Sequence, residues 1–157
     1  MDDQGDECGA DPGTVTPSVL MSAPGIAQKL SAIYSDADGY ANLKQVSFLV
    51  NPTASVANGI VLMYDRTANK LYLYNDAGTA YVGSCTPGVA GSLANTRGTL
   101  NCGATTVTGS ANNLTINWNI TPKAAYTSAT KRNLYLHARD MSNATAGWTD
   151  KGDWTIK

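Results

Sequence analysis

Residues 114–120 read LTINWNI, an unbroken alternation of apolar and polar side chains. Because successive side chains of a β-strand point to opposite faces, this pattern predicts a strand with one buried face and one face turned to solvent. No other stretch of the chain alternates as regularly. The residues expected on the buried face are Leu114, Ile116, Trp118 and Ile120.

Shorter alternating stretches occur on both sides of this segment, broken roughly every 8–12 residues by Gly, Asn, Asp, Pro or Ser. No stretch has a helical period, and the one glutamate of the chain is Glu7. The pattern predicts an all-β sandwich. We expect strands at residues 15–21, 27–35, 46–50, 60–64, 71–74, 79–82, 114–120, 133–139 and 147–156, and a long connection at residues 85–110.

The N-terminal segment differs in composition from the rest of the chain. Residues 1–13 combine acidic residues, Gly and Pro with nothing apolar to bury, which is typical of a flexible linker, so we expect one domain at residues 14–157. Pro17 cannot donate to a β-ladder, and the strand expected at residues 15–21 is therefore an edge strand. The first residues lack the layout of a signal peptide, so we interpret Met1 as an expression start on a fragment of a longer protein.

Three cysteines are present, Cys8, Cys85 and Cys102. Cys85 and Cys102 each lie beside turn residues at an expected strand end, and we expect them to form a disulfide, with Cys8 left over. Such a bond is typical of an oxidising compartment and therefore of an extracellular or cell-surface protein. Zinc binding is disfavoured because His137 is the only histidine, and neither cysteine has the cationic surroundings that activate a nucleophilic thiol.

Charge and composition argue against several classes of function. The net charge is about −1 and no basic run is present, which disfavours nucleic acid as a partner. No apolar run approaches the roughly 18 residues needed to cross a bilayer, so membrane insertion is not expected. The Gly-x-Ser-x-Gly nucleophile turn of α/β-hydrolases is absent from this chain, and the only glutamate available as a glycosidase acid lies in the expected tail. We therefore expect no enzyme, no catalytic residues and no organic cofactor.

Asp36 and Asp38 form the best metal candidate of the sequence. Two carboxylates one residue apart in a loop that ends with Gly39 can bind a structural Ca²⁺ with help from backbone carbonyls. The loop lacks the terminal glutamate and the further ligands of helix-loop-helix calcium sites. An Asx-turn between two strands accounts for the same residues and is the favoured interpretation.

Four aromatic residues, Tyr72, Tyr74, Tyr81 and Trp148, are candidates for ligand binding. If they project from one sheet face, they can stack on sugar rings while neighbouring polar side chains bind hydroxyl groups. Tyrosine at alternating strand positions is also favoured by cross-strand packing alone, which is the simpler explanation. Trp118 and Trp154 lie on apolar faces and are assigned to the core.

Three regions of the sequence resemble a known kind of module. Residues 34–43, the hairpin formed by residues 62–65 and 71–80, and the pair formed by residues 133–140 and 147–156 resemble immunoglobulin-like modules of large secreted or surface bacterial proteins. The resemblance covers residues 15–157 and implies a Greek-key antiparallel β-sandwich of about 7–9 strands. The glycine-rich stretch between the two later cysteines is longer than such modules require.

Two functions are compatible with this resemblance. The favoured one is a non-catalytic extracellular spacer or adhesion unit, with neighbouring domains of a larger protein as partners and self-association through the strand at residues 15–21 as a variant. The alternative is a carbohydrate-binding module that holds polysaccharide on exposed Tyr and Trp side chains. Fold resemblance alone does not choose between them.

Overall fold

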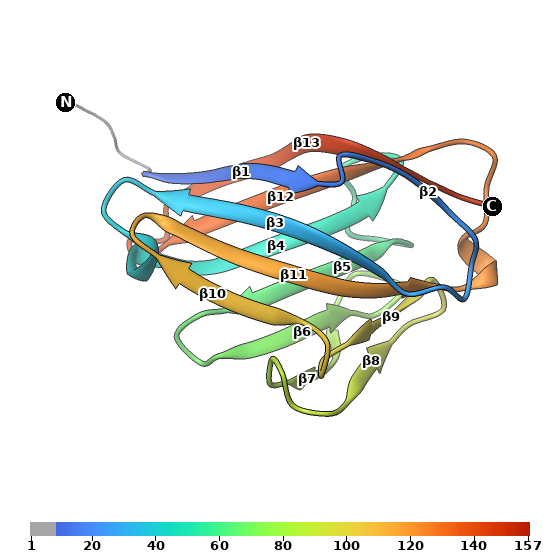
Figure 1. Ribbon diagram of the computed structural model, residues 1–157, viewed down its shortest axis with the longest axis horizontal. Helices are drawn as coiled ribbons and strands as arrows, with labels where there is room; N and C mark the ends of the chain where they lie inside the picture. Colours follow the sequence, from blue (N-terminus) through green and yellow to red (C-terminus); the bar gives the residue numbers. More distant parts are fainter. Residues whose placement is uncertain (1–8) are drawn as a thin grey trace.

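The computed structural model describes residues 9–157, which form two facing β-sheets (Figure 1). The six-stranded sheet contains β1 (Ala10–Thr16), β3 (Gln28–Asp36), β8 (Ser92–Ala94), β9 (Gly98–Asn101), β10 (Thr106–Ser110) and β11 (Asn113–Pro122). The seven-stranded sheet contains β2 (Val19–Ser22), β4 (Leu43–Asn51), β5 (Ile60–Asp65), β6 (Lys70–Tyr74), β7 (Tyr81–Cys85), β12 (Arg132–Asp140) and β13 (Thr145–Ile156). Two short 3-10 helices, η1 (Tyr40–Asn42) and η2 (Ala124–Tyr126), lie in connections between the sheets.

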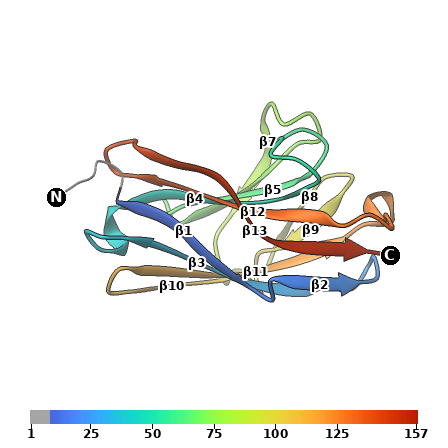
Figure 2. The same ribbon diagram turned by 90° about the horizontal axis from the view of Figure 1, so that it is seen from above.

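The strand order shows how the chain moves between the two layers. One sheet runs β1-β3-β11-β9-β8, with β10 also paired to β11, and the other runs β2-β13-β12-β4-β5-β6-β7. The pairs are antiparallel except β2 with β13. Seen from above, β3, β10 and β11 lie along one side and β4 and β5 along the other (Figure 2). The predicted all-β sandwich is thus confirmed.

The core lies between the layers and follows the alternation of the sequence. The expected inner face of residues 114–120 is fully buried, and so are the inner residues of β3, β4 and β12. Phe48 of one sheet meets Trp118 of the other, with ring centroids 6.2 Å apart. Large apolar side chains from both sheets therefore interdigitate, as close packing of a sandwich requires.

The strand expected at residues 15–21 is in fact divided between the two sheets. β1 ends at Thr16 and pairs with β3, whereas β2 begins at Val19 and pairs with β13 of the opposite sheet. Pro17 lies at the crossing, where its missing N–H is not required by either ladder. β1 also starts at Ala10, so the tail expected at residues 1–13 is too long at its C-terminal end. Residues 1–8 lie outside the described part of the chain.

The prediction of a long connection at residues 85–110 was also wrong in part. It contains β8, β9 and β10, which raises the number of strands above the 7–9 expected. Each of these short strands contributes about one inward apolar side chain, such as Leu100, so no alternation is readable in the sequence.

The disulfide between Cys85 and Cys102 is confirmed. It joins β7, at the end of the seven-stranded sheet, to the residue that follows β9 in the other sheet. A disulfide of this kind indicates an oxidising, non-cytoplasmic environment. In residues 9–157, no helix is long and apolar enough to span a membrane.

Candidate functional site

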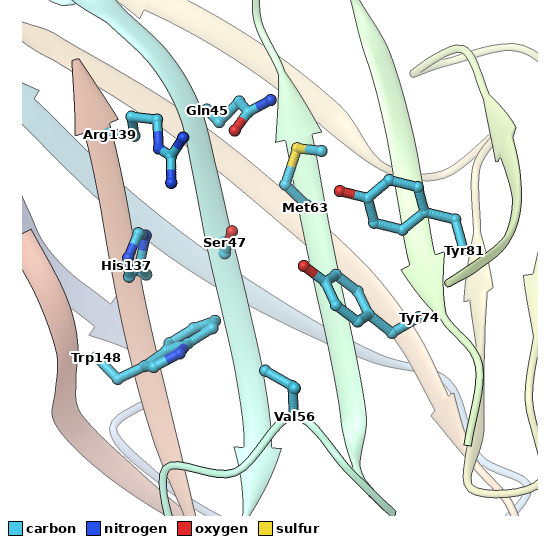
Figure 3. A pocket seen from close by; sticks show the side chains of 9 residues that line it. All are labelled: Gln45, Ser47, Val56, Met63, Tyr74, Tyr81, His137, Arg139 and Trp148. Atoms are coloured by element: carbon cyan, nitrogen blue, oxygen red, sulfur yellow. The ribbon is translucent and has the colours of Figure 1, made fainter. Parts of the chain in front are cut away.

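A shallow groove lies on the outer face of the seven-stranded sheet (Figure 3). Its volume is about 180 Å³, below the roughly 300–1,000 Å³ of pockets that enclose a small molecule. The groove is therefore suited to one part of an extended ligand. Its lining residues are Gln45, Ser47, Val56, Met63, Tyr74, Tyr81, His137, Arg139 and Trp148.

The first wall of the groove comes from β12 and β13. Alternation along β12 buries Leu136 and Ala138 and therefore turns His137 and Arg139 to the outer face. β13 has a bulge at this point, because two of its residues stand between the pairs Leu136–Thr149 and Ala138–Ala146, where β12 has only one. A bulge re-aims side chains, and here it accompanies Trp148 packed on His137 with ring centroids 5.1 Å apart.

His137 is held neutral by its surroundings. Partial burial lowers the pKa of its imidazole, and the nearby positive charge of Arg139 lowers that pKa further. At neutral pH the first wall therefore offers one aromatic ring, one neutral imidazole and one guanidinium.

The second wall is a cluster of three tyrosines. Tyr72 and Tyr74 share a face of β6, two residues apart, and Tyr81 of β7 packs between them. The ring centroid of Tyr81 lies 4.6 Å from that of Tyr72 and 5.0 Å from that of Tyr74, the second contact being edge-on. Burial and the neighbouring tyrosines raise the pKa of Tyr81 to about 12, so its hydroxyl is a neutral donor and acceptor.

Small and flexible side chains form the floor. Ser47 of β4 stands between His137 and Met63 in one row across the sheet, and Gln45 stands beside Arg139 in the next row. Because Ser47 is the smallest of these side chains, the face is hollow between the two aromatic walls (Figure 3). β4 and β5, which carry the floor residues, are each paired with a strand on both sides.

Val56 closes one end of the groove from the β4–β5 connection (Figure 3). This connection is held by Asn51, whose side-chain amide donates to the carbonyls of Ser55 at 2.7 Å and Ala57 at 3.1 Å. Tyr126 donates in turn to Asn51 Oδ1 at 3.0 Å. The end of the groove is thus fixed by a buried polar network.

The aromatic residues singled out in the sequence are brought together by the fold. Tyr74, Tyr81 and Trp148 line the groove, and Tyr72 packs against Tyr81 at its margin. Four further members of the same site were not predicted from the sequence: His137, Arg139, Gln45 and Ser47. The burial pattern of β4 and β12 places them on the outer face, but only the strand order places them opposite the tyrosines.

Asp36 and Asp38 lie apart from the groove, at the end of β3. The carboxylate of Asp36 accepts a hydrogen bond from the backbone N–H of Asp38 at 2.8 Å and another from the Asn42 amide at 3.2 Å. This is the expected Asx-turn. Among residues 9–157 there is no cluster of three or more His, Cys, Asp or Glu side chains that could hold a metal ion. Calcium binding here stays a prediction.

No protein-family model matches this chain, and no curated protein matches it in sequence.

Proposed function

We propose that this chain is a non-catalytic, extracellular immunoglobulin-like module that binds carbohydrate in the outer groove of its seven-stranded sheet. The order of strands supports the immunoglobulin-like assignment. β1, β3, β11 and β9 follow one another as strands A, B, E and D do in such domains, and β13, β12, β4, β5 and β6 correspond to G, F, C, C′ and C″.

The observation that carries the proposal is the pair of aromatic walls facing each other across a polar floor (Figure 3). A sugar ring has apolar C–H faces, which stack on aromatic rings, and equatorial hydroxyls, which need hydrogen-bond partners. Trp148 and Tyr74 supply the rings, while Ser47, Gln45 and the tyrosine hydroxyls supply the partners. No Asp or Glu is among the described residues that line the groove, which favours binding over glycoside hydrolysis.

Affinity electrophoresis in gels containing a panel of neutral and acidic polysaccharides tests this proposal. We expect at least one polysaccharide to retard the protein, and Trp148→Ala or Tyr74→Ala to weaken that binding about two- to tenfold, because a stacking contact contributes roughly 0.5–1.5 kcal/mol. Tyr40→Ala, in η1 outside the groove, is the matched aromatic control and should bind as the parent does. The proposal fails if no polysaccharide retards the protein, or if both groove variants bind like the control.

A second candidate, self-association, is favoured by the edge strand β2. Val19 and Met21 are 75% and 66% exposed on this strand, which pairs only with β13 among the described strands. An exposed apolar edge is a template for pairing with another chain. Light scattering should then show a dimer that Val19→Lys with Met21→Lys converts to a monomer. A parent protein that is monomeric at all concentrations would exclude this candidate.

A further inference from the structure

Arg139 is distinguished from the other arginines by what its guanidinium contacts. Arg66 donates to the carbonyls of Leu43 and Ala41, Arg97 pairs with Asp76, and Arg132 stacks on the ring of Tyr126. Within residues 9–157, Arg139 makes no ion pair, side-chain hydrogen bond or ring contact, although it lines the groove beside Gln45 (Figure 3). A half-buried guanidinium therefore faces the groove with its donors unused by the described residues.

The carboxylates near Arg139 are engaged elsewhere. Asp65 lies in the same row across the sheet, beyond Gln45. Its Oδ1 accepts from Thr67 N, Thr67 Oγ1 and Ala68 N, and its carboxylate also interacts with the side chain of Gln45. Asp140 follows Arg139 in the chain but is buried, and it accepts from the N–H groups of two turn residues. On the outer face of β13, Asp150 accepts from Gly152 N.

We infer that the groove is specific for acidic sugars and that Arg139 binds the carboxylate of a uronic-acid residue. This inference rests on the proposed function of the same groove. A guanidinium has a planar fork of N–H donors that matches both oxygens of a carboxylate, and such charge-assisted bonds are about twice as strong as neutral ones. The aromatic walls then hold the sugar rings, and Arg139 selects those that carry a carboxylate.

Isothermal titration calorimetry with paired oligosaccharides tests the inference. The probes are oligomers of galacturonate, glucuronate and mannuronate, each paired with its carboxyl-reduced neutral form. We expect at least one acidic oligomer to bind ten times more tightly than its neutral form, and Arg139→Gln to abolish the difference by weakening acidic binding more than neutral binding. Arg139→Lys should restore part of the preference for the acidic oligomer, since lysine keeps the positive charge but lacks the planar set of N–H donors.

The outcomes separate the two proposals. Equal binding of acidic and neutral forms, or a preference that survives in Arg139→Gln, overturns the role of Arg139 and leaves carbohydrate binding intact. If no acidic or neutral oligomer binds and the polysaccharide panel is also negative, both proposals fail. Trp148→Ala should weaken acidic and neutral binding alike, which distinguishes a lost stacking contact from a lost ion pair. Thermal unfolding of each variant confirms that it is folded.

Discussion

The hydroxyl of Tyr34 donates a 2.9 Å hydrogen bond to the backbone carbonyl of Ser47. Tyr34 belongs to the six-stranded sheet and Ser47 to the floor of the groove in the other, so this bond joins the two layers directly beneath the candidate site. Trp118 Nε1 donates to the same hydroxyl at 3.3 Å. Burial raises the pKa of Tyr34, which therefore remains a neutral donor.

Tyr34→Phe is expected to lower the free energy of unfolding by about 1–3 kcal/mol, because it removes the partner of a buried indole N–H and one bond to a buried carbonyl. Chemical denaturation measures the change. Tyr40→Phe is the control, since the Tyr40 hydroxyl has no hydrogen bond within residues 9–157, and its effect should stay within about 0.5 kcal/mol. A Tyr34→Phe protein as stable as the control would show that the bond between the layers contributes nothing.

Removal of the disulfide by Cys85→Ala with Cys102→Ala should lower stability by about 3 kcal/mol, because the bond restricts the unfolded chain. For a domain of this size that corresponds to a decrease in Tm of roughly 6–12 °C by calorimetry. Cys85 ends the strand that carries Tyr81, so glycan affinity should fall as well. Unchanged Tm in the double variant, matched by unchanged Tm of the parent under reducing conditions, would contradict this account.

The pH dependence of stability should carry a signature of His137. Burial lowers the pKa of this imidazole in the folded protein below its ordinary value of 6.5, so the unfolded chain binds more protons in that window. The contribution of neutral His137 to stability is therefore complete above about pH 6.5 and is lost as the pH falls through the folded-state pKa. His137→Gln should flatten the stability profile between about pH 7 and pH 5. Parallel profiles for the two proteins would show that the imidazole is not perturbed.

The loop at the end of β3 is expected to be stabilised by hydrogen bonds alone. Asp36→Ala should lower stability by about 1–3 kcal/mol, because it leaves the Asp38 N–H and the Asn42 amide without their acceptor. Differential scanning calorimetry with Ca²⁺ and with chelator separates this role from metal binding. Equal Tm values in the two conditions are expected, whereas a Tm raised by Ca²⁺ in the parent but not in Asp36→Ala would establish a calcium site.

Much of the fold could be predicted from the sequence, because a strand with one buried face has alternating apolar and polar residues. The alternation over residues 114–120 identified Trp118 as a core residue, and the hairpin of β5 and β6 was found with nearly its observed bounds. Strands β8, β9 and β10 show no such alternation, since each is short and contributes about one apolar side chain to the core. The edge position expected from Pro17 is confirmed, because β1 and β2 both lie at sheet edges. A missing N–H does not reveal, however, that the residues on its two sides join different sheets.

Only part of the groove could be predicted from the sequence, because its residues are brought together by long-range strand pairing. Tyr74 and Trp148 attract attention as aromatic residues in polar surroundings, but 73 positions separate them, and their proximity depends on the long-range order β13-β12-β4-β5-β6. The bulge opposite His137 depends on pairing in three dimensions. Nothing in the sequence distinguishes Arg139 from the other arginines. It becomes a candidate ligand contact only because its side chain has no partner in the part of the chain that the structure describes.

The most direct test of carbohydrate binding in the outer groove is a titration of ¹⁵N-labelled protein with the tightest-binding oligosaccharide, followed by NMR. We predict shifts at the indole N–H of Trp148 and at the backbone amides of Ser47, Tyr74 and His137, with Ser31 and Asn117 on the outer face of the other sheet unchanged. Shifts confined to Ser31, Asn117 and their neighbours, with Trp148 unmoved, would contradict the account.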